Sequence, residues 1–437
     1  MKIKYLKKYG CYLINDDNHK AHLLNFDNNR IIQVSSNFEE ICDHLSDVFL
    51  KILCDEGIVS FKKKNFVIEK TYSPTSVTFL MTTRCNLKCV YCYAYNNCNE
   101  NLSFSSAKIT IDYLINNAIN KGAKEITIRF HGLGEPTQNF DVLKQIVEYT
   151  KSECNRLLLL ANFHITSNGI MKDEHRKYIQ KNFDYITLSI DGTKKYQNVQ
   201  RPLPNGDSFE EAIKTLYSIK NKDNLLIRTT VTNFSLENLE EWCEFLNKNG
   251  FKNINIEPVS VCGNCFNNGI TDLDNKFCEI FCILCKKFTN MKISYSCFRR
   301  SNRCFHCGAF GSNMVITPFN DISTCYECFD IEDKAQSLFL IGKIKDGNIC
   351  IDEKKISMLN ETSLMLRNEC SSCYAQTFCN GSCLSKRYKS FIEKGNSYSI
   401  VANKCKITRK LLIDKLIERV AFEISFTHSE RLFWFLE

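Results

Sequence analysis

The 437-residue chain has no run of uncharged apolar residues long enough to cross a membrane. It also lacks an arginine-rich block, and its formal net charge of +8 is spread along the sequence, which disfavours nucleic acid as a partner. Residues 1–9 are rich in lysine, but no apolar stretch follows them as it would in a signal peptide. We therefore expect a cytoplasmic protein that binds neither a membrane nor nucleic acid.

Cysteine, in contrast, is abundant, with 25 positions in the chain. Disulfides are rare in the cytoplasm, so cysteine at this density indicates metal binding or catalysis rather than a disulfide framework. The chain is also long enough for two or three domains. The spacing of the cysteines is therefore the main guide to function.

Three cysteines fall on one short stretch, Cys85, Cys89 and Cys92, with Tyr91 directly before the third. A four-iron cluster normally takes four cysteine ligands, so three thiolates on one loop leave one iron open. A zinc site is the alternative, and Cys98 would then supply the fourth ligand. The CxxxCxxC spacing with its aromatic residue resembles the signature of the radical S-adenosylmethionine (SAM) enzymes. The resemblance implies that SAM binds the open iron and is cleaved to a 5′-deoxyadenosyl radical, with these three cysteines as the catalytic ligands.

Between residues 76 and 290, expected strands and helices alternate six times. The strands are expected at 77–81, 126–130, 163–166, 186–190, 226–231 and 254–258. Amphipathic helices are expected at 107–121, 142–150, 174–181, 209–220, 239–248 and 273–288. Repeated βα units form parallel sheets, and in barrels of this kind the chemistry gathers at the carboxyl ends of the strands. We therefore expect an α/β fold, and six units match the partial (β/α)6 barrel of the radical SAM family.

The strand ends carry the polar residues that such a barrel needs. Gly134 and Glu135 follow the second strand and resemble the family's Gly-Gly-Glu-Pro motif, although Leu133 stands where the motif has its first glycine. The resemblance implies that this turn binds the amino group of SAM and that Tyr91 lies against the adenine. It also implies further SAM contacts at the other strand ends, from Ser167, Asn168, Ser189, Asp191, Arg201 and Arg228. Glu257, at the end of the sixth strand, either faces the substrate or is an ordinary strand-end residue.

A second group of cysteines lies near the other end of the chain. Cys370, Cys373, Cys379 and Cys383 have the spacing CxxCxxxxxCxxxC, Cys405 follows them, and Cys307 and Cys325 precede them. This pattern resembles the SPASM extension of peptide-modifying radical SAM enzymes, which we expect at 291–437. The extension has a glycine separated by four residues from its second cysteine, and this chain has Asn320 at that position. Asparagine tolerates a left-handed backbone, so we expect the turn to persist.

The SPASM resemblance implies two auxiliary 4Fe–4S clusters, which makes three clusters in all. The first auxiliary cluster would be held by Cys307, Cys325, Cys383 and one upstream cysteine, for which Cys304 is preferred and Cys297 is the alternative. Cys328 is a further competitor for an iron. The second would be held by Cys370, Cys373, Cys379 and Cys405.

Two further cysteine groups have plainer explanations. Cys278, Cys282 and Cys285 repeat the CxxxCxxC spacing, but on an expected helix that spacing is one face, so core packing is favoured. Cys262 and Cys265 flank a glycine after the sixth strand, where a turn is favoured over a further metal site.

Residues 1–75 are expected to form a separate small unit. Short apolar stretches at 10–14 and 22–26 predict a hairpin, a β-branched stretch follows at 31–34, and 38–52 has helical spacing. A basic turn at 62–64 between apolar stretches predicts a wing. This winged-helix-like order resembles the leader-peptide recognition elements of peptide-modifying enzymes; a structural cap is the alternative.

The resemblances together favour a peptide maturase. Anaerobic sulfatase maturases have an aspartate directly after the cysteine that corresponds to Cys325, where this chain has Tyr326. We therefore favour an enzyme that forms thioether crosslinks in a ribosomally made, cysteine-containing precursor peptide, with flavodoxin or ferredoxin as electron donor. Carbon–carbon crosslinking, epimerisation and formylglycine formation are alternatives within the class. An iron–sulfur scaffold without SAM cleavage and a zinc-binding nucleic-acid module are alternatives outside it.

Overall fold

The computed structural model describes residues 2–6, 8–15, 20–25, 30–41, 46–59, 72–94, 98–259, 270–298, 305–371 and 373–426. Cys304, Cys262, Cys265 and the predicted wing lie outside the described residues. No described helix is both long and apolar enough to span a bilayer.

A single large sheet organises the chain from residue 76 onward. Its strand order is β11-β10-β9-β8-β7-β6-β5-β12-β13-β14-β15. The six predicted strands are all present and parallel to their neighbours, as β5 (Ser76–Leu80), β6 (Glu125–His131), β7 (Leu160–Ser167), β8 (Tyr185–Ser189), β9 (Leu225–Val231) and β10 (Asn253–Pro258). A further parallel strand, β11 (Lys292–Ser294), pairs with β10 beyond the predicted barrel end at residue 290. Three residues are too few to give a periodic signal, so this strand could not be predicted.

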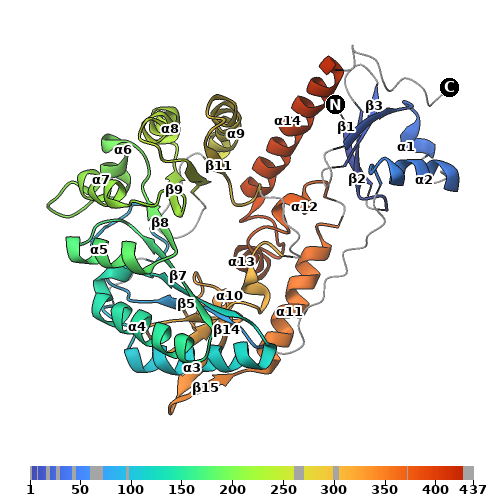
Figure 1. Cartoon of the computed structure of the whole chain (residues 1–437). Helices are drawn as coiled ribbons and strands as arrows, with labels where there is room; N and C mark the ends of the chain where they lie inside the picture. Colours follow the sequence, from blue (N-terminus) through green and yellow to red (C-terminus); the bar gives the residue numbers. More distant parts are fainter. Residues whose placement is uncertain are drawn as a thin grey trace.

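Helices cover the outer side of the curved parallel sheet (Figure 1). They are α3 (Phe104–Lys121), α4 (Phe140–Arg156), α5 (Asp173–Asn182), α6 (Lys194–Gln200), α7 (Ser208–Ser218), α8 (Leu239–Lys248) and α9 (Ile270–Lys287). Local sequence sets their ends: the Ser103 hydroxyl accepts the backbone N–H of Ser106 at the start of α3, and Gly122 ends that helix with a φ of +63°. Because the sheet does not close on itself, the fold is the partial barrel that the sequence predicts.

The two faces of the sheet differ in chemistry. In β6, Ile126, Ile128 and Phe130 are buried, whereas Arg129 is exposed and His131 is half-buried. The same alternation in β9 exposes Arg228. Alternate residues of a strand point to opposite faces, so the apolar residues pack under the helices and the polar ones face the concave side. The concave side is therefore a polar, partly open space rather than a packed core.

The C-terminal part is continuous with the same sheet. It contains β12 (Val315–Ile316), β13 (Asp321–Ser323), α10 (Lys334–Ser337), β14 (Leu340–Lys345) and β15 (Asn348–Ile351), followed by α11 (Glu353–Asn368), α12 (Gln376–Cys379), α13 (Leu384–Lys394) and α14 (Ala402–Phe426). β12 pairs in parallel with β5, and β13 to β15 continue antiparallel. Asn320, between β12 and β13, has a φ of +65°, which confirms the left-handed turn predicted there. The extension is thus joined to the first barrel strand by backbone hydrogen bonds.

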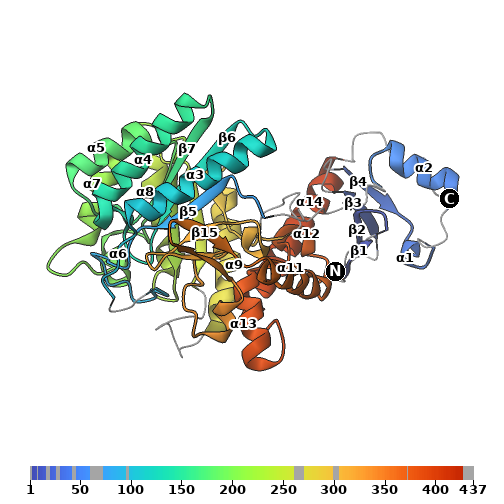
Figure 2. The same ribbon diagram turned by 90° about the horizontal axis from the view of Figure 1, so that it is seen from below.

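The N-terminal unit is an antiparallel sheet with two short helices. Its strands are β1 (Lys2–Leu6), β2 (Cys11–Asn15), β3 (Ala21–Asn25) and β4 (Arg30–Val34), and its helices are α1 (Phe38–Ile41) and α2 (Asp47–Asp55). The predicted hairpin is confirmed as β2–β3. The helix predicted over 38–52 is two helices in the structure, and part of the connection between them is outside the described residues. One sheet face packs against these helices, and the other contacts α12 and α14 (Figure 2).

Candidate active site and metal centres

The loop that carries Cys85, Cys89 and Cys92 follows β5 at the carboxyl edge of the sheet. Backbone hydrogen bonds tie it to the segment after β8: the N–H of Lys88 donates to the carbonyl of Pro202 and that of Val90 to Gln200, each at 3.0 Å. The loop is therefore held against another strand end, as a cofactor site at the barrel mouth requires.

Polar groups surround the sulfur atoms of this loop. The Asn168 amide lies 3.9 Å from the Cys85 sulfur, and the Arg201 guanidinium lies 3.9 Å from that of Cys89. Burial of its sulfur raises the pKa of Cys85 to about 12, although the residue as a whole is partly open to solvent, and burial raises that of Cys89 to about 11. Without a metal these groups are thiols, and metal binding releases their protons.

Two glycines make the turn after β6 possible. A Cβ atom at Gly132 would lie 1.8 Å from the carbonyl oxygen of Gly134, and one at Gly134 would lie 1.9 Å from that of Arg84. The N–H of Gly134 donates to Thr82 at 2.9 Å. Leu133 is buried in a small apolar cluster that includes Leu80, which explains a side chain where the family motif has glycine. The turn thus lies directly against the cysteine loop.

Glu135 joins this turn to the end of β7. Its buried carboxylate accepts the Ser167 hydroxyl at 2.8 Å and the backbone N–H of Asn168 at 2.7 Å. It also accepts the backbone N–H of Thr137 at 3.2 Å. Burial raises the pKa of Glu135. Three of the predicted SAM contacts are therefore brought together, and Glu135 itself is largely occupied in positioning its neighbours.

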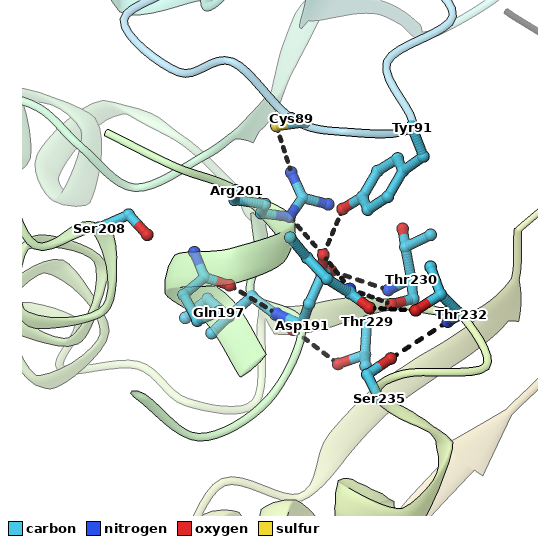
Figure 3. Close-up of polar contacts among 12 residues, drawn as sticks. Cys89, Tyr91, Asp191, Gln197, Arg201, Ser208, Thr229, Thr230, Thr232 and Ser235 are labelled. Carbon is cyan, nitrogen blue, oxygen red and sulfur yellow. Dashed lines mark hydrogen bonds and ion pairs between the residues drawn. The ribbon is translucent and has the colours of Figure 1, made fainter. Parts of the chain in front are cut away.

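Asp191 is the centre of a second polar network, which Figure 3 shows. Its carboxylate accepts hydrogen bonds from the Tyr91 hydroxyl and, at 2.9 Å, from the Nε2 of Gln200. The same carboxylate forms an ion pair with the Nε of Arg201 at 2.9 Å. It also accepts the backbone N–H of Thr230 at 2.9 Å. The guanidinium of Arg201 lies 5.4 Å from the centre of the Tyr91 ring. The structure therefore fixes the orientation of Tyr91, the aromatic residue of the cysteine loop, from a different strand end.

Sequence reasoning missed two members of this network. The side chain of Gln200 donates a hydrogen bond to the Asp191 carboxylate. The side chain of Gln197 accepts the backbone N–H of Asp191 at 2.8 Å (Figure 3). Both lie on α6, which is a single short helix without a distinctive sequence pattern. Only their tertiary contacts give them a role.

Ser189 and Arg228 are two further predicted SAM contacts, and neither side chain is hydrogen-bonded to Asp191. Ser189 is opposite Arg228 in the β8–β9 pairing. The Arg228 guanidinium donates to the Asn255 amide oxygen at 3.2 Å and is exposed on the concave side. Their contacts with SAM stay a prediction. Glu257 accepts the backbone N–H and the hydroxyl of Ser296, at 2.7 and 2.9 Å, and is buried.

An aromatic pair lies between the two halves of the site. The rings of His131, at the end of β6, and Tyr326 stack with centroids 4.9 Å apart and an interplanar angle of 27°. Burial, together with the charge of Arg228, lowers the pKa of His131 to about 4, against the opposing effects of its contact with the Gly132 carbonyl and of Glu327. The imidazole is therefore neutral at neutral pH. Because Tyr326 directly follows Cys325, the pair spans from the barrel strands to the first auxiliary cysteines.

Cys307, Cys325 and Cys383 are close enough to affect one another's ionisation. Burial, together with the neighbouring Cys383 and Cys325, raises the pKa of Cys307 to about 12. The Cys328 thiol donates to Cys325, which lowers the pKa of Cys325 and raises that of Cys328. Cys328 is therefore close enough to Cys325 to compete for an iron of the first auxiliary cluster, as the sequence predicted. Cys297 interacts instead with Cys379 of the second group.

Cys370, Cys373, Cys379 and Cys405 line one cavity of about 250 Å³. Since a water molecule occupies about 30 Å³ of liquid, this space is far larger than a single ion needs. Among the residues that the structure describes, no group of three cysteine, histidine or acidic side chains is arranged around one ion. All described cysteines are free thiols. Four sulfurs around a cavity fit a four-iron cluster better than zinc, whose ligands converge on one point at about 2.3 Å.

The structure confirms core packing for Cys278, which is buried, and Cys282 is partly buried, whereas Cys285 is exposed and the packing predicted for it is wrong. The Cys278 sulfur lies 3.8 Å from the carbonyl oxygen of Ile407, and the Cys282 sulfur lies 3.8 Å from the Asp414 carboxylate. Both contacts are with α14, so this face of α9 joins two helices.

Comparison with known proteins places this geometry in a family. Residues 79–256 match the model of the Radical SAM superfamily. An uncharacterized protein of Methanocaldococcus jannaschii is 36% identical over 40% of this chain and 60% of its own length. A cysteine-type anaerobic sulfatase-maturating enzyme of Clostridium novyi is 27% identical over 40% of this chain and 49% of its own length. The chain thus spans about half to three fifths of these relatives.

Solved structures agree on the architecture. The anaerobic sulfatase maturase anSMEcpe with bound AdoMet has a TM-score of 0.65 at 18% identity and covers 80% of this chain and 98% of its own. Streptococcus suis SuiB bound to precursor peptide SuiA has a TM-score of 0.51 at 15% identity and covers 92% of this chain and 99% of its own. Residues 79–256 contain the cysteine loop and most of strands β5 to β10. This chain therefore contains a radical SAM domain, on a partial barrel of the kind that these enzymes share.

Proposed function

We propose that this protein is a radical SAM peptide maturase that installs thioether crosslinks in a ribosomally made, cysteine-containing precursor peptide. One observation carries the proposal: a three-cysteine loop and two further cysteine groups belong to one fold, in which the extension continues the barrel sheet through the β12–β5 pairing. Cys85, Cys89 and Cys92 hold the first cluster, and the later groups hold the auxiliary ones.

The bound cluster and SAM supply the 5′-deoxyadenosyl radical that such chemistry needs. The residues of the chain supply position. Gly134 and Asn168 lie beside the cysteine loop, and Asp191 fixes Tyr91 and Arg201 around it. Glu135 holds two of these elements together. A site whose polar groups are fixed by other buried groups loses little energy to reorganisation during the reaction.

The concave face supports a peptide as substrate. It is polar and partly open, with Arg228 exposed and the His131–Tyr326 pair along its wall. The net reaction joins the sulfur of a substrate cysteine to a carbon and removes two hydrogens. One hydrogen would leave as an atom to the adenosyl group and the other as a proton to solvent. The auxiliary cysteine groups would hold clusters able to take up the one surplus electron and pass it to an external acceptor, and flavodoxin or ferredoxin would supply the electron for SAM cleavage. SuiB, bound to its precursor peptide, has a similar fold, which also favours this substrate class.

The N-terminal unit is proposed to bind the leader of the precursor. Both faces of its sheet are covered among the described residues, one by α1 and α2 and the other by residues of α12 and α14. An extended leader would therefore have to pair with an edge strand, β1 or β4. The cytoplasm is the compartment in which these clusters and a free precursor are both expected.

Co-expression with the small open reading frame beside its gene tests the proposal. A thioether product loses two hydrogens per crosslink, and fragmentation by mass spectrometry locates the bond. Replacing the core cysteines of the precursor by serine should abolish the mass change. A product in a precursor that lacks cysteine would contradict the thioether assignment.

The relatedness to sulfatase maturases favours one second candidate, the oxidation of a cysteine to formylglycine. The two outcomes differ in chemistry, because formylglycine carries an aldehyde that reacts with hydrazide reagents and a thioether does not. Labelling of the product by a hydrazide would therefore favour this alternative.

A further inference from the structure

The cavity of the second auxiliary site is lined by more than its four cysteines. Two arginines, Arg387 of α13 and Arg409 of α14, also line it, together with Glu369 and Tyr398. A cluster with four thiolate ligands is an anion in both oxidation states and becomes more negative on reduction. Charges that face such a site therefore act on its reduction potential, which depends on net charge, hydrogen bonds and exposure.

Arg387 is almost fully buried, with 2% of its side chain exposed. Its Nη2 atom forms an ion pair with Glu369 at 2.9 Å and donates to the Ser397 hydroxyl at 2.9 Å, and its Nη1 donates to the carbonyl of Gly381 at 3.2 Å. Its Nε is buried and has no hydrogen-bond partner in the structure. The Arg387–Glu369 pair is neutral overall, but the Nε–H of Arg387 has no partner, on a side chain that lines the cavity.

Arg409 gives the lining of the cavity a net positive charge. It lies four residues after Cys405 on α14, so the two side chains share one face of the helix. It also interacts with the sulfur of Cys373, which lines the same cavity. Among the residues that the structure describes, no carboxylate forms an ion pair with Arg409. Arg409 is exposed to solvent on its other side, and its positive charge acts on two of the four thiols, those of Cys373 and Cys405.

We propose that Arg409, assisted by the Nε of Arg387, raises the reduction potential of the cluster held by Cys370, Cys373, Cys379 and Cys405. The reduced cluster carries one more negative charge than the oxidised one, and the arginine stabilises that extra charge. The site then accepts one electron readily, with no proton and no change in its ligands. This inference rests on the proposed function, because it requires a cluster in this cavity.

The test uses the full-length chain with Cys85, Cys89 and Cys92 replaced by alanine, so that only the auxiliary clusters are present. After anaerobic reconstitution, the midpoint potential is measured by redox titration monitored by electron paramagnetic resonance. We expect Arg409→Gln to lower the equilibrium constant for reduction about tenfold, which is a shift of about 59 mV to more negative potential for one electron. Arg409→Lys, which keeps the charge, should shift it less.

Two controls make the result specific. Arg156→Gln removes an exposed arginine of α4 that pairs with Glu153, and should leave both auxiliary potentials unchanged. Glu369→Gln removes a negative charge from the same cavity and should shift the potential in the positive direction. An unchanged potential in Arg409→Gln, at the same iron content as the parent protein, overturns the inference and leaves the proposed function intact. Absence of iron from the parent protein overturns the proposed function itself.

Discussion

The hydroxyl of Tyr12 in β2 donates a hydrogen bond of 2.8 Å to the backbone carbonyl of Tyr374, 362 residues later in the chain. Tyr374 directly follows Cys373, a predicted ligand of the second auxiliary cluster. Around this bond, Ile14 and Leu24 of the N-terminal sheet pack with Phe378. The unit proposed to bind the leader is thus attached to the loop that is proposed to hold a cluster.

Tyr12→Phe should loosen this attachment. The substitution removes the hydroxyl donor and leaves the partly buried carbonyl of Tyr374 without this hydrogen bond. We expect the free energy of the attachment to fall by about 1 kcal/mol. We expect faster proteolytic release of the N-terminal unit and faster amide exchange in residues 8–15. Tyr185→Phe, at an exposed position of β8, is the matched control and should change neither. Equal protease sensitivity in the two variants would contradict the role of this bond.

Simultaneous replacement of Cys85, Cys89 and Cys92 by alanine should abolish 5′-deoxyadenosine formation while most of the iron remains, because the auxiliary cysteines are on separate elements. The measurement is product analysis after addition of dithionite and SAM, with iron analysis on the same sample. Replacement of Cys278, Cys282 and Cys285 in α9 is the matched control and should preserve the product. Loss of all iron in the first variant would argue against the auxiliary sites.

Gly134→Ala should disrupt SAM binding. The new Cβ would lie 1.9 Å from the carbonyl oxygen of Arg84, so the cysteine loop or the turn must move. We expect at least a tenfold loss of SAM affinity, which is about 1.4 kcal/mol. Gly122→Ala is the control: it meets nothing within 4 Å and only its left-handed backbone is strained, at about 1–2 kcal/mol of stability. If the two variants bound SAM with equal affinity, the close approach of Gly134 to the Arg84 carbonyl would not be needed for SAM binding.

Asp191→Asn should weaken the orientation of Tyr91 and Arg201. It removes the negative partner of a buried ion pair, a change that typically costs about 3–5 kcal/mol of stability because the remaining charge is left unpaired. We expect a lower melting temperature and weaker SAM binding by calorimetry. Asp207→Asn, which affects the partly exposed N-cap of α7, should leave SAM binding unchanged. Normal SAM binding by Asp191→Asn would exclude this residue from the site.

The His131 imidazole should make stability depend on pH. Its pKa is lowered to about 4 in the folded protein, against an ordinary value near 6.5, because burial disfavours the charged ring. The unfolded chain therefore binds more protons between these values, so stability is present above pH 6.5 and is lost as the pH falls toward 4. The full effect is at most about 3 kcal/mol. Arg228 and Glu327 are the charged groups that act on the ring.

Denaturant unfolding of His131→Gln between pH 4.5 and 7 checks this expectation. The variant should have a flatter dependence on pH than the parent protein. His175→Gln on α5 is the comparison, because burial also lowers the pKa of that ring but different charged groups, Glu174, Lys172 and Asp141, act on it. An identical slope in parent and His131→Gln would contradict the assignment.

The sequence predicted what depends on local pattern. Alternating strands and helices predicted the six parallel strands, and cysteine spacing predicted both groups of candidate ligands. A left-handed turn at Asn320 was predictable because few residues tolerate that conformation. The short strand β11 and the division of the first helix were not, since a few residues carry no periodic signal.

Tertiary structure decided everything that joins distant segments. Gln197 and Gln200 support Asp191 only because α6 folds back onto β8, and Arg409 faces Cys373 only because α14 closes the second cavity. Cysteine ligands are fixed by their chemical type and short spacing, which a sequence displays directly. Charges and amides that tune a site act through space over many residues, so their roles exist only once the chain has brought them together.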